Sequence, residues 1–441
     1  MSQSDLIIGA GMTGLAAGMS SGLPVYEAEA IPGGICSSYY LKPGESEPLG
    51  ESATAADLDQ AYRFEIGGGH WIFGGDPTVL SLIERLVDVV RYERRSSVFF
   101  PETGKYVPYP LQNNLRHLDA ELAAVAIDEM ARPKGSTATM QQWLTEYFGP
   151  TLSALFFEPF HELYTAGLHT RIAPQDAYKS PVDIGMAVRG ALLDAPPVGY
   201  NTTFLYPGQG LDALARKMAE SCDVRYGKRV VGIDGGKRRV SFADGSHAEY
   251  RSVLSTLPLN VAADLAGIST RAPADPHSSV LVLNIGGVRG PRCPDDHWLY
   301  IPRSDSGFHR VGFYSNVDAS FMPRESRATQ SRVSIYVEKA FQAGQAPSPE
   351  EVSRYGDAVA AELIRWGYIS SAEVVHPTWI EVAYTWSWPG SSWRSEAMSA
   401  LQRMGIYQIG RYGRWNFQGI ADSIRDGFVA GNSFGSAGGK A

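Results

Sequence analysis

A glycine-rich turn near the N-terminus most constrains how this chain folds. The short apolar run at residues 5–8 is followed by Gly9-Ala10-Gly11-Met12-Thr13-Gly14 and then by small, helix-forming residues. In a strand–turn–helix unit, Gly9 permits the tight turn, Gly11 lets a pyrophosphate approach the backbone, and Gly14 lets helix and sheet pack closely. Glu27 ends the next apolar run, near the spacing at which a carboxylate accepts hydrogen bonds from ribose hydroxyls. The pattern predicts an α/β dinucleotide-binding domain.

Two further segments indicate which dinucleotide binds. Gly33 and Gly34 follow Glu27 in a pattern that resembles the extended fingerprint of FAD-containing, amine-oxidase-like flavoproteins, which favours FAD over NAD. Near the C-terminus, an apolar strand, a turn containing Arg411 and a helix opening around Asp422 resemble the second FAD motif of that superfamily. The resemblance implies that this helix N-terminus faces the isoalloxazine, so distant segments would build one flavin domain.

Composition limits the partners and the compartment. The net charge of −8 disfavours a nucleic-acid partner, and three scattered cysteines favour a reducing compartment. The N-terminus lacks the basic start of a signal peptide, and no apolar run has the length of a membrane span. We therefore expect a soluble, cytoplasmic protein without a membrane partner. The histidines show no metal-ligand spacing, so no metal site is predicted.

The length of 441 residues predicts more than one domain. Helical spacing covers residues 77–92 and 119–169, strand-like runs cover 224–259, 279–317 and 373–388, and residues 41–60 read as an exposed excursion. The prediction is an α/β fold: a Rossmann-like FAD domain built from discontinuous segments, a helical insertion and an antiparallel-sheet substrate domain. The predicted boundaries are 1–76, 200–265 and 395–441 for the FAD domain, 77–199 for the insertion with a sheet-domain hairpin, and 266–394 for the substrate domain.

Two stretches between the FAD motifs carry candidate site residues. Residues 65–73 bring a glycine run with Gly69 and His70 against aromatic residues, which suits a backbone passing close to a planar ring. In KYVPYPLQNNL, Pro108 and Pro110 stiffen an extended segment that leads into Gln112. Amides there donate and accept hydrogen bonds, which suits hydroxyls and a diphosphate. An ordinary solvated loop is the alternative.

With these motifs together, the chain resembles the UDP-galactopyranose mutases, which interconvert the pyranose and furanose forms of a nucleotide-linked sugar. The specific parts are the paired FAD motifs, GGHWIF, YVPYPLQNN, NTTFLYP, STLPL, and WLYIP followed by FHRVGFYSN. The resemblance implies that reduced FAD attacks the anomeric carbon through the flavin N5, so that FAD is active when reduced and NAD(P)H or a reductase must supply electrons. The oligomeric state stays open.

The resemblance also implies roles for individual residues. His70 matches a histidine beside the flavin and Arg310 an arginine that clamps the diphosphate, a task that suits a permanently charged donor. These two are the candidate catalytic residues. The candidate cofactor-binding residues are Gly9, Gly11, Gly14, Glu27, Gly33, Gly34, Gly69, Arg94, Arg411 and Asp422. The candidate substrate-binding residues are Gln112, His161, Asn201, Arg310, Tyr384 and Phe417.

The sequence departs from the family pattern at several positions. Diphosphate tyrosines of the family fall on Val317 and Phe417, and a mobile-loop histidine falls on Gly75. A second diphosphate arginine is missing, and Lys179 or Arg189 is a candidate replacement. The segment around His161, where the family holds uracil, keeps little of the usual pattern, so a different base or hexose, such as a GDP-hexose, stays open.

A rival prediction is an FAD-dependent oxidase of the amine-oxidase or protoporphyrinogen-oxidase type, which shares the FAD motifs. Its pocket would be mainly apolar or aromatic. Arg310, Gln112 and Asn201 argue against this reading, while the aromatic segment YTWSWPGSSW favours it. A non-catalytic flavin or nucleotide-sugar binding protein is a third reading.

Overall fold

The computed structural model describes residues 4–50, 52–175, 182–196, 198–199 and 201–435. A parallel sheet forms around the N-terminal strand β1, which has β2 on one side and β13 on the other. β10 extends this sheet beyond β2, and β19 pairs with β13. The strands span β1 Ser4–Ile8, β2 Val25–Tyr26, β10 Val224–Arg225, β13 His247–Ser255 and β19 Ile406–Gln408. Because these strands come from three distant segments, the structure confirms the predicted Rossmann-like fold built from discontinuous chain.

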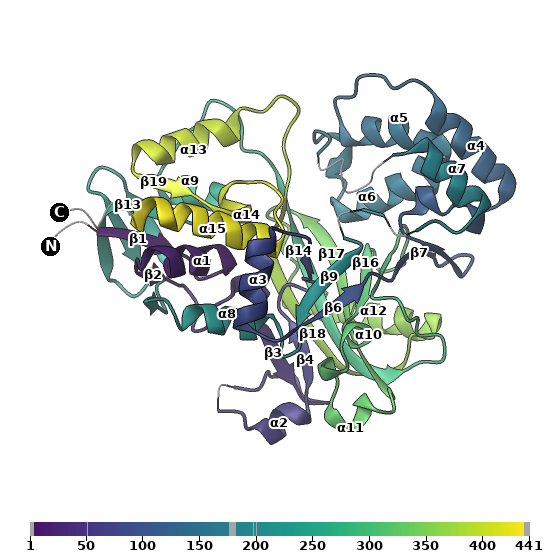
Figure 1. Ribbon diagram of the computed structural model, residues 1–441, viewed down its shortest axis with the longest axis horizontal. Helices are drawn as coiled ribbons and strands as arrows, with labels where there is room; N and C mark the ends of the chain where they lie inside the picture. Colours follow the sequence, from purple (N-terminus) through teal and green to yellow (C-terminus); the bar gives the residue numbers. More distant parts are fainter. Residues whose placement is uncertain (1–3, 51, 176–181, 197, 200, 436–441) are drawn as a thin grey trace.

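Helices cover the parallel sheet (Figure 1), and small residues let two of them pack closely. In α15, a Cβ added at Gly427 would lie 2.1 Å from the carbonyl oxygen of Thr13 in α1, so only glycine permits this approach. β11 and β12 continue from β13 as an antiparallel meander. The bounds are α1 Met12–Ser21, α8 Leu211–Ala219, α9 Leu259–Leu265, α13 Trp393–Arg403, α14 Gly410–Gly413, α15 Ile420–Gly435, β11 Val230–Asp234 and β12 Arg239–Phe242.

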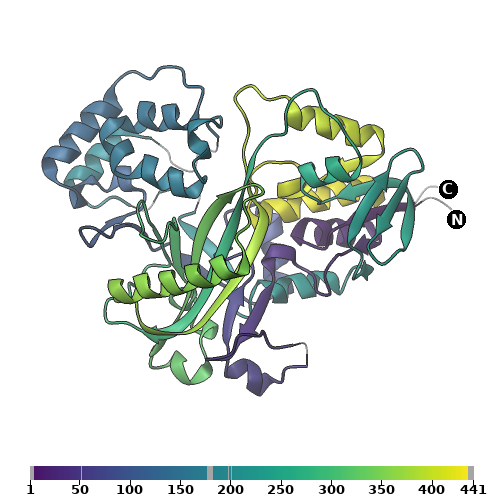
Figure 2. The same cartoon turned by 180° about the vertical axis from the view of Figure 1, so that it is seen from behind.

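A second, seven-stranded sheet crosses the centre of the molecule (Figure 1) in the order β18-β14-β17-β16-β15-β7-β8. All its pairs are antiparallel except β15 with β7. Helix α12 (Pro349–Trp366) lies along this sheet in Figure 2. The strands span β7 Ser96–Phe100, β8 Lys105–Pro108, β14 His277–Arg289, β15 Trp298–Tyr300, β16 Arg310–Phe313, β17 Arg332–Gln342 and β18 Ile369–Thr385.

A helical unit stands apart from the parallel sheet, at the upper right of Figure 1. Its core is aromatic: the rings of Phe148 and Phe157 stack with centroids 3.8 Å apart, and Phe156 packs beside them. The helices are α4 Ala120–Ala131, α5 Met140–Leu152, α6 Glu158–Tyr164 and α7 Ile184–Leu192, with a π-helical turn at Ser153–Phe157 between α5 and α6. After this turn, Phe160 of α6 packs against Tyr300 and His309 at the central sheet, with ring centroids 5.6 Å and 6.0 Å apart.

Two small sheets and several short helices complete the chain. β5 (Ile72–Phe73), β9 (Thr203–Pro207) and β6 (Val89–Glu93) form one sheet, and β3 (Ser38–Leu41) pairs with β4 (Tyr62–Glu65) in the other. Short helices are α10 Tyr314–Val317 and α11 Arg324–Arg327. β9 therefore pairs outside the parallel sheet, and the predicted domain boundaries stay a prediction.

The helix expected over residues 77–92 is wrong in its second half. α3 covers only Pro77–Leu86. The rest of the predicted helix contains the start of strand β6, because Val89 and Val90 pair with β9. The excursion at residues 41–60 contains a short helix, α2 (Ala55–Asp59), which begins with a capping box between Thr54 and Asp57. β17 and α12 lie between the predicted strand regions and were not predicted.

Candidate functional site

One cavity of about 490 Å³ joins the glycine-rich turn, the central sheet and the helical unit. At its cofactor end, a Cβ added at Gly9 would lie 2.1 Å from Thr256 Oγ1, and one at Gly14 would lie 1.8 Å from the Gly9 carbonyl oxygen. A Cβ at Gly11 would meet no protein atom within 4 Å, and Gly11 lines the cavity. The first and third glycines thus serve packing, whereas the second leaves open space for a ligand.

The same end of the cavity offers donors for a dinucleotide. Helix α1 has no side-chain cap and no acidic residue in its first turn, and Met12 and Thr13 line the cavity, so its N-terminal N–H groups suit a pyrophosphate. Glu27 Oε2 accepts a hydrogen bond from the Ala10 N–H at 2.6 Å. Gly33 and Gly34 also line the cavity with φ of +110° and +58°, a region that favours glycine. This cradle fits FAD.

A glycine loop and His70 form the middle of the cavity wall. Gly69 is required there, because an added Cβ would lie 2.0 Å from the Tyr336 hydroxyl oxygen. Burial and the positive charge of Arg411 lower the pKa of His70 to about 4, so its ring is neutral at physiological pH. The His70 Nδ1 atom is buried and has no partner among the described residues, so it is poised to meet a bound ligand.

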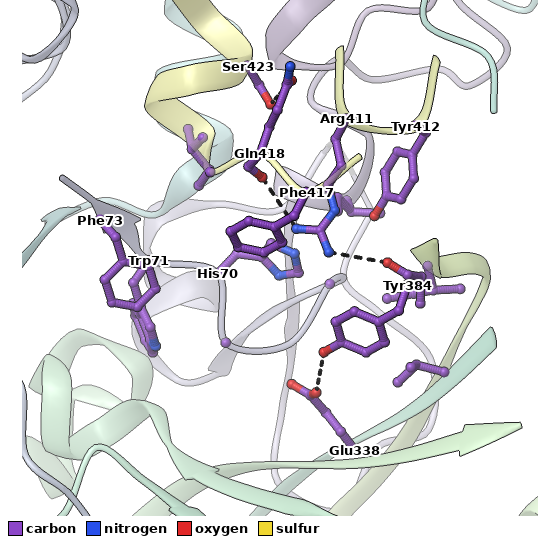
Figure 3. A pocket seen from close by; sticks show the side chains of 18 of the residues that line it. His70, Trp71, Phe73, Glu338, Tyr384, Arg411, Tyr412, Phe417, Gln418 and Ser423 are labelled. Carbon is purple, nitrogen blue, oxygen red and sulfur yellow. Dashed lines mark hydrogen bonds between the residues drawn. The ribbon is translucent and has the colours of Figure 1, made fainter. Parts of the chain in front are cut away.

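The second FAD motif places Arg411 above this loop (Figure 3). Its guanidinium lies 4.7 Å from the centroid of the Phe417 ring and donates to the carbonyl oxygens of Gln418 and Ala383, both at 3.4 Å. Asp422 lies in the first turn of α15 and is exposed, and its carboxylate accepts from the Gly419 N–H at 3.1 Å. Asp422 therefore caps the helix, while Gln418, Gly419 and Ile420 line the cavity.

The central sheet carries an ion pair into the cavity. Arg310 Nη2 donates to Glu338 Oε2 at 2.5 Å and to the Tyr384 hydroxyl at 3.1 Å, and Figure 3 shows Tyr384 beside Glu338. Burial opposes ionisation of Glu338, but the adjacent Arg310 outweighs it and lowers the pKa of Glu338 to about 2. The predicted clamp Arg310 is thus paired with a carboxylate. Glu338 is absent from the candidate list, although the strand-like run VSIYVEKAF contains this one acidic residue.

The far end of the cavity is mainly aromatic and lies against the helical unit. His161 donates from Nδ1 to the Phe157 carbonyl oxygen at 2.7 Å, and burial lowers its pKa to about 4. Its Nε2 is therefore an acceptor at neutral pH. Lining residues that were not predicted include Tyr109, Trp143, Phe156, Phe160, Tyr164, Gln175, Tyr300, His309 and Trp386. An isolated aromatic residue in a sequence does not indicate a position in a cavity wall, since most aromatic residues pack in the core.

Four predicted residues do not line the cavity. Arg94 is buried behind Asn201, to whose side-chain oxygen it donates, and Asn201 itself lines the cavity. Gln112 is buried in the turn after the two prolines, where α7 packs closely: a Cβ at Gly190 would lie 1.9 Å from the Asn113 carbonyl oxygen. The other two are Gly14, which packs against the Gly9 carbonyl oxygen, and Asp422, which caps α15.

Outcomes differ at the positions that depart from the family pattern. Arg189 is exposed on α7 and lies outside the lining, and Lys179 lies outside the described residues. Val317 is buried in the core, and Phe417 lines the cavity beside Arg411. A Cβ at Gly75 would lie 2.5 Å from Ala421, so this glycine lets its loop dock on α15.

Comparison with known proteins assigns the family. A model of flavin-containing amine oxidoreductases matches residues 17–280, which is more than half of the chain. The chain belongs to the flavin-containing amine oxidoreductase family. The family match and the glycine cradle together identify the cofactor as FAD.

Solved structures share the fold over almost the whole chain. A reduced UDP-galactopyranose mutase superposes with a TM-score of 0.83 at 21% identity, covering 100% of this chain and 97% of that one. A candidate protoporphyrinogen oxidase from an Exiguobacterium species gives a TM-score of 0.69 at 15% identity, covering 99% of each chain. A putrescine oxidase gives 0.58 at 17%, covering 98% of each. The confirmed resemblance to the mutase concerns the fold, and the oxidases share the same architecture.

The sequence predicts neither a metal site nor a membrane span. Within those residues, no group of three or more histidine, cysteine, aspartate or glutamate side chains is placed to hold a metal ion. No described helix combines the length and the apolar character needed to cross a membrane.

Proposed function

We propose that this protein is an FAD-dependent mutase that interconverts the pyranose and furanose forms of a nucleotide-diphosphate sugar. The observation that carries the proposal is the position of Arg310 and Tyr384 in the same cavity as the FAD cradle. A permanently charged donor and a phenol there suit a diphosphate, which an amine or porphyrin substrate lacks. The full-length fold likeness to a mutase supports this choice.

The side chains divide the work of such a reaction. Arg310 and Tyr384 bind the diphosphate and stabilise the negative charge that develops on it as its bond to the anomeric carbon breaks. Neutral His70 and the aromatic residues around it shape a cavity that restricts water. Reduced FAD, when bound, supplies a nucleophilic nitrogen at the anomeric carbon. A different hydroxyl of the sugar closes the new ring, and the diphosphate held by Arg310 and Tyr384 re-forms its bond to the anomeric carbon, so the reaction is redox-neutral overall.

The hydrogen-bonding groups at the far end of the cavity limit which nucleotide base the substrate carries. We infer a UDP-hexose or a different nucleotide sugar such as a GDP-hexose, because the neutral His161 Nε2 can accept a hydrogen bond and both uracil and guanine carry N–H donors. Electrons to reduce FAD would come from NAD(P)H or a reductase.

The test uses purified, FAD-loaded enzyme under anaerobic conditions, in reduced and oxidised forms. Each form is incubated with UDP-, GDP- and TDP-hexopyranoses, and products are separated by chromatography and assigned by NMR. The expected result is conversion of one nucleotide sugar by the reduced enzyme alone, with many more turnovers than the reductant supplied. Because the reaction is redox-neutral, dithionite should not be consumed in proportion to product.

The second candidate is an oxidase, which the aromatic far end of the cavity favours. In parallel, the oxidised enzyme is given putrescine, other amines and protoporphyrinogen in air, and oxygen uptake is followed. If the reduced enzyme converts none of the nucleotide sugars and the oxidised enzyme consumes oxygen with one of these substrates, the mutase proposal is wrong.

A further inference from the structure

The register of the central sheet makes Glu338 and Arg310 neighbours. They stand directly opposite each other on the antiparallel strands β17 and β16, so both side chains emerge on the same face. That face is the wall of the cavity. The Glu338 side chain is 3% exposed and that of Arg310 is 23% exposed, so the carboxylate lies deeper than the guanidinium.

Two polar atoms of this ion pair have no hydrogen-bond partner among the described residues. Glu338 Oε2 accepts from Arg310 Nη2 at 2.5 Å and from the Tyr384 hydroxyl at 3.4 Å. Glu338 Oε1 is fully buried and has no partner among the described residues, and the same holds for Arg310 Nε. A buried acceptor and a buried donor without partners are costly, so a bound molecule that satisfies both would gain affinity.

The unpaired carboxylate oxygen lies where the cofactor end of the cavity meets the substrate end. A Cβ added at Gly68 would come within 3.1 Å of Glu338 Oε1, and Gly68 directly precedes the Gly69-His70 wall. Figure 3 shows the Glu338 carboxylate turned toward the loop that carries His70. Because Gly68 has no side chain, the loop can lie close against this oxygen, next to the cavity wall that Gly69 and His70 form.

The chemistry of the two atoms defines that group. Despite its burial, Glu338 is held ionised by Arg310, with a pKa of about 2, so Oε1 can only accept a hydrogen bond. The ligand must offer an O–H or N–H donor there and, beside it, an acceptor for the Arg310 Nε–H. A sugar carrying a phosphate has both groups within one residue. A diamine has donors but no acceptor, and it would bring positive charge beside Arg310.

Resting on the proposed function, we propose that Glu338 is a substrate-contacting residue whose Oε1 accepts a hydrogen bond from a hydroxyl of the sugar, while Arg310 donates to its phosphate. Glu338 therefore binds the sugar, whereas Arg310 binds the diphosphate. Binding of a nucleoside diphosphate without the sugar does not use the Glu338 contact.

The test compares two ligand pairs, UDP-galactose with UDP and GDP-mannose with GDP, by calorimetry on the FAD-loaded, oxidised enzyme. The measured quantity is the ratio of the dissociation constant of the sugar nucleotide to that of the diphosphate. For the better-binding pair, Glu338→Ala should raise this ratio by about tenfold or more, the scale of losing a hydrogen bond to a charged group. Glu338→Gln should raise it less, because a neutral hydrogen bond is weaker than a charge-assisted one.

A matched control is Glu362→Gln. Glu362 is also buried, but it accepts from the backbone N–H groups of Asp305 and Ser306, both at 2.9 Å, and lies outside the cavity lining. This variant should leave the ratio unchanged. FAD content and the flavin absorption spectrum are recorded for every variant, because an Oε1 that bonds to the flavin instead would change these and not the ratio.

The outcomes separate the two proposals. An unchanged ratio in Glu338→Ala and Glu338→Gln, with both ligands weakened equally, would mean that Glu338 only holds Arg310 and would overturn the inference. If Glu338→Ala does not fold, the ratio in Glu338→Gln decides. If the wild-type enzyme binds neither sugar nucleotide nor diphosphate, the proposed function itself fails.

Discussion

The guanidinium of Arg94 donates a hydrogen bond to the side-chain oxygen of Asn201, a residue far along the chain. The same guanidinium donates to the Tyr109 carbonyl oxygen at 3.0 Å and to the Val198 carbonyl oxygen at 3.3 Å. Arg94 is buried and lies outside the cavity lining, whereas Asn201 and Tyr109 line it. Arg94 therefore holds two segments of the cavity wall together.

We expect Arg94→Ala to weaken nucleotide-sugar binding while FAD content stays near wild type. The loss should be about 1–3 kcal/mol, because one buried and two partly buried acceptors lose their donor. Arg91→Ala, which removes an exposed arginine from the preceding strand β6, is the control. Calorimetry gives the affinity and flavin absorbance gives the FAD content. Loss of FAD with normal affinity in the remaining holoenzyme would instead assign Arg94 to the cofactor, as the sequence suggested.

Two glycine variants should separate packing from cofactor binding. Gly14→Ala places a methyl group 1.8 Å from a backbone oxygen and should destabilise the apoprotein by about 1–3 kcal/mol, the usual cost of overpacking. Gly11→Ala meets no protein atom, so the apoprotein should unfold normally while FAD binds more weakly. Thermal denaturation of apoprotein and fluorescence titration with FAD measure the two effects. Equal behaviour of the two variants in both assays would contradict this division of roles.

Sequence patterns predicted the parts of this molecule that depend on local chemistry. The Gly9, Gly11 and Gly14 turn needs glycine for steric reasons that hold in any context, so its strand–turn–helix setting was foreseeable. The discontinuous FAD fold followed from two such motifs at opposite ends of the chain. The predicted end of the helix over residues 77–92 was wrong, because a neighbouring strand determines the local structure there. Val89 and Val90 form a strand because β9 lies beside them.

The candidate site was harder to predict, because its key relationships join distant strands. Arg310 was recognised from its motif, but its carboxylate partner depends on the register of β16 against β17, which no local pattern gives. Likewise, Arg94 was assigned to the cofactor from a motif match, and only the fold puts Asn201 between it and the cavity. A charged residue in an apolar strand such as VSIYVEKAF was the available signal for Glu338.

Replacing the clamp should weaken substrate binding without loss of cofactor. Arg310→Ala should cost about 1.5–3 kcal/mol of nucleotide-sugar affinity, the scale of a hydrogen bond to a charged group. It also leaves Glu338 without its countercharge, so binding should improve as the pH is lowered and Glu338 takes up a proton. Arg303→Ala removes an exposed arginine from the neighbouring loop as a control. Calorimetry that gives the same affinity for Arg310→Ala and wild type would place the clamp elsewhere.

A buried carboxylate away from the cavity should make stability depend on pH. Glu65 is fully buried, accepts from the Tyr206 hydroxyl and from Ser38 Oγ, and burial raises its pKa from 4.5 to about 7 against the opposing charge of Arg63. The folded protein binds this proton more tightly than the unfolded chain does. Protonated Glu65 therefore adds to the free energy of unfolding in full below pH 4.5, and this stabilisation is lost as the pH rises through about 7.

Glu65→Gln cannot lose a proton, so its melting temperature should fall less than that of the wild type between pH of about 5 and 8. The wild type should lose stability over this interval relative to the variant, and the difference should be largest at the alkaline end. Calorimetric scans at a series of pH values, with Glu362→Gln as a second buried glutamate replacement, measure the effect. Parallel curves for the wild type and Glu65→Gln would show that Glu65 does not titrate in this range. A wild type that gains stability relative to the variant between pH of about 5 and 8 would mean that Arg63 stabilises the carboxylate more than burial opposes it.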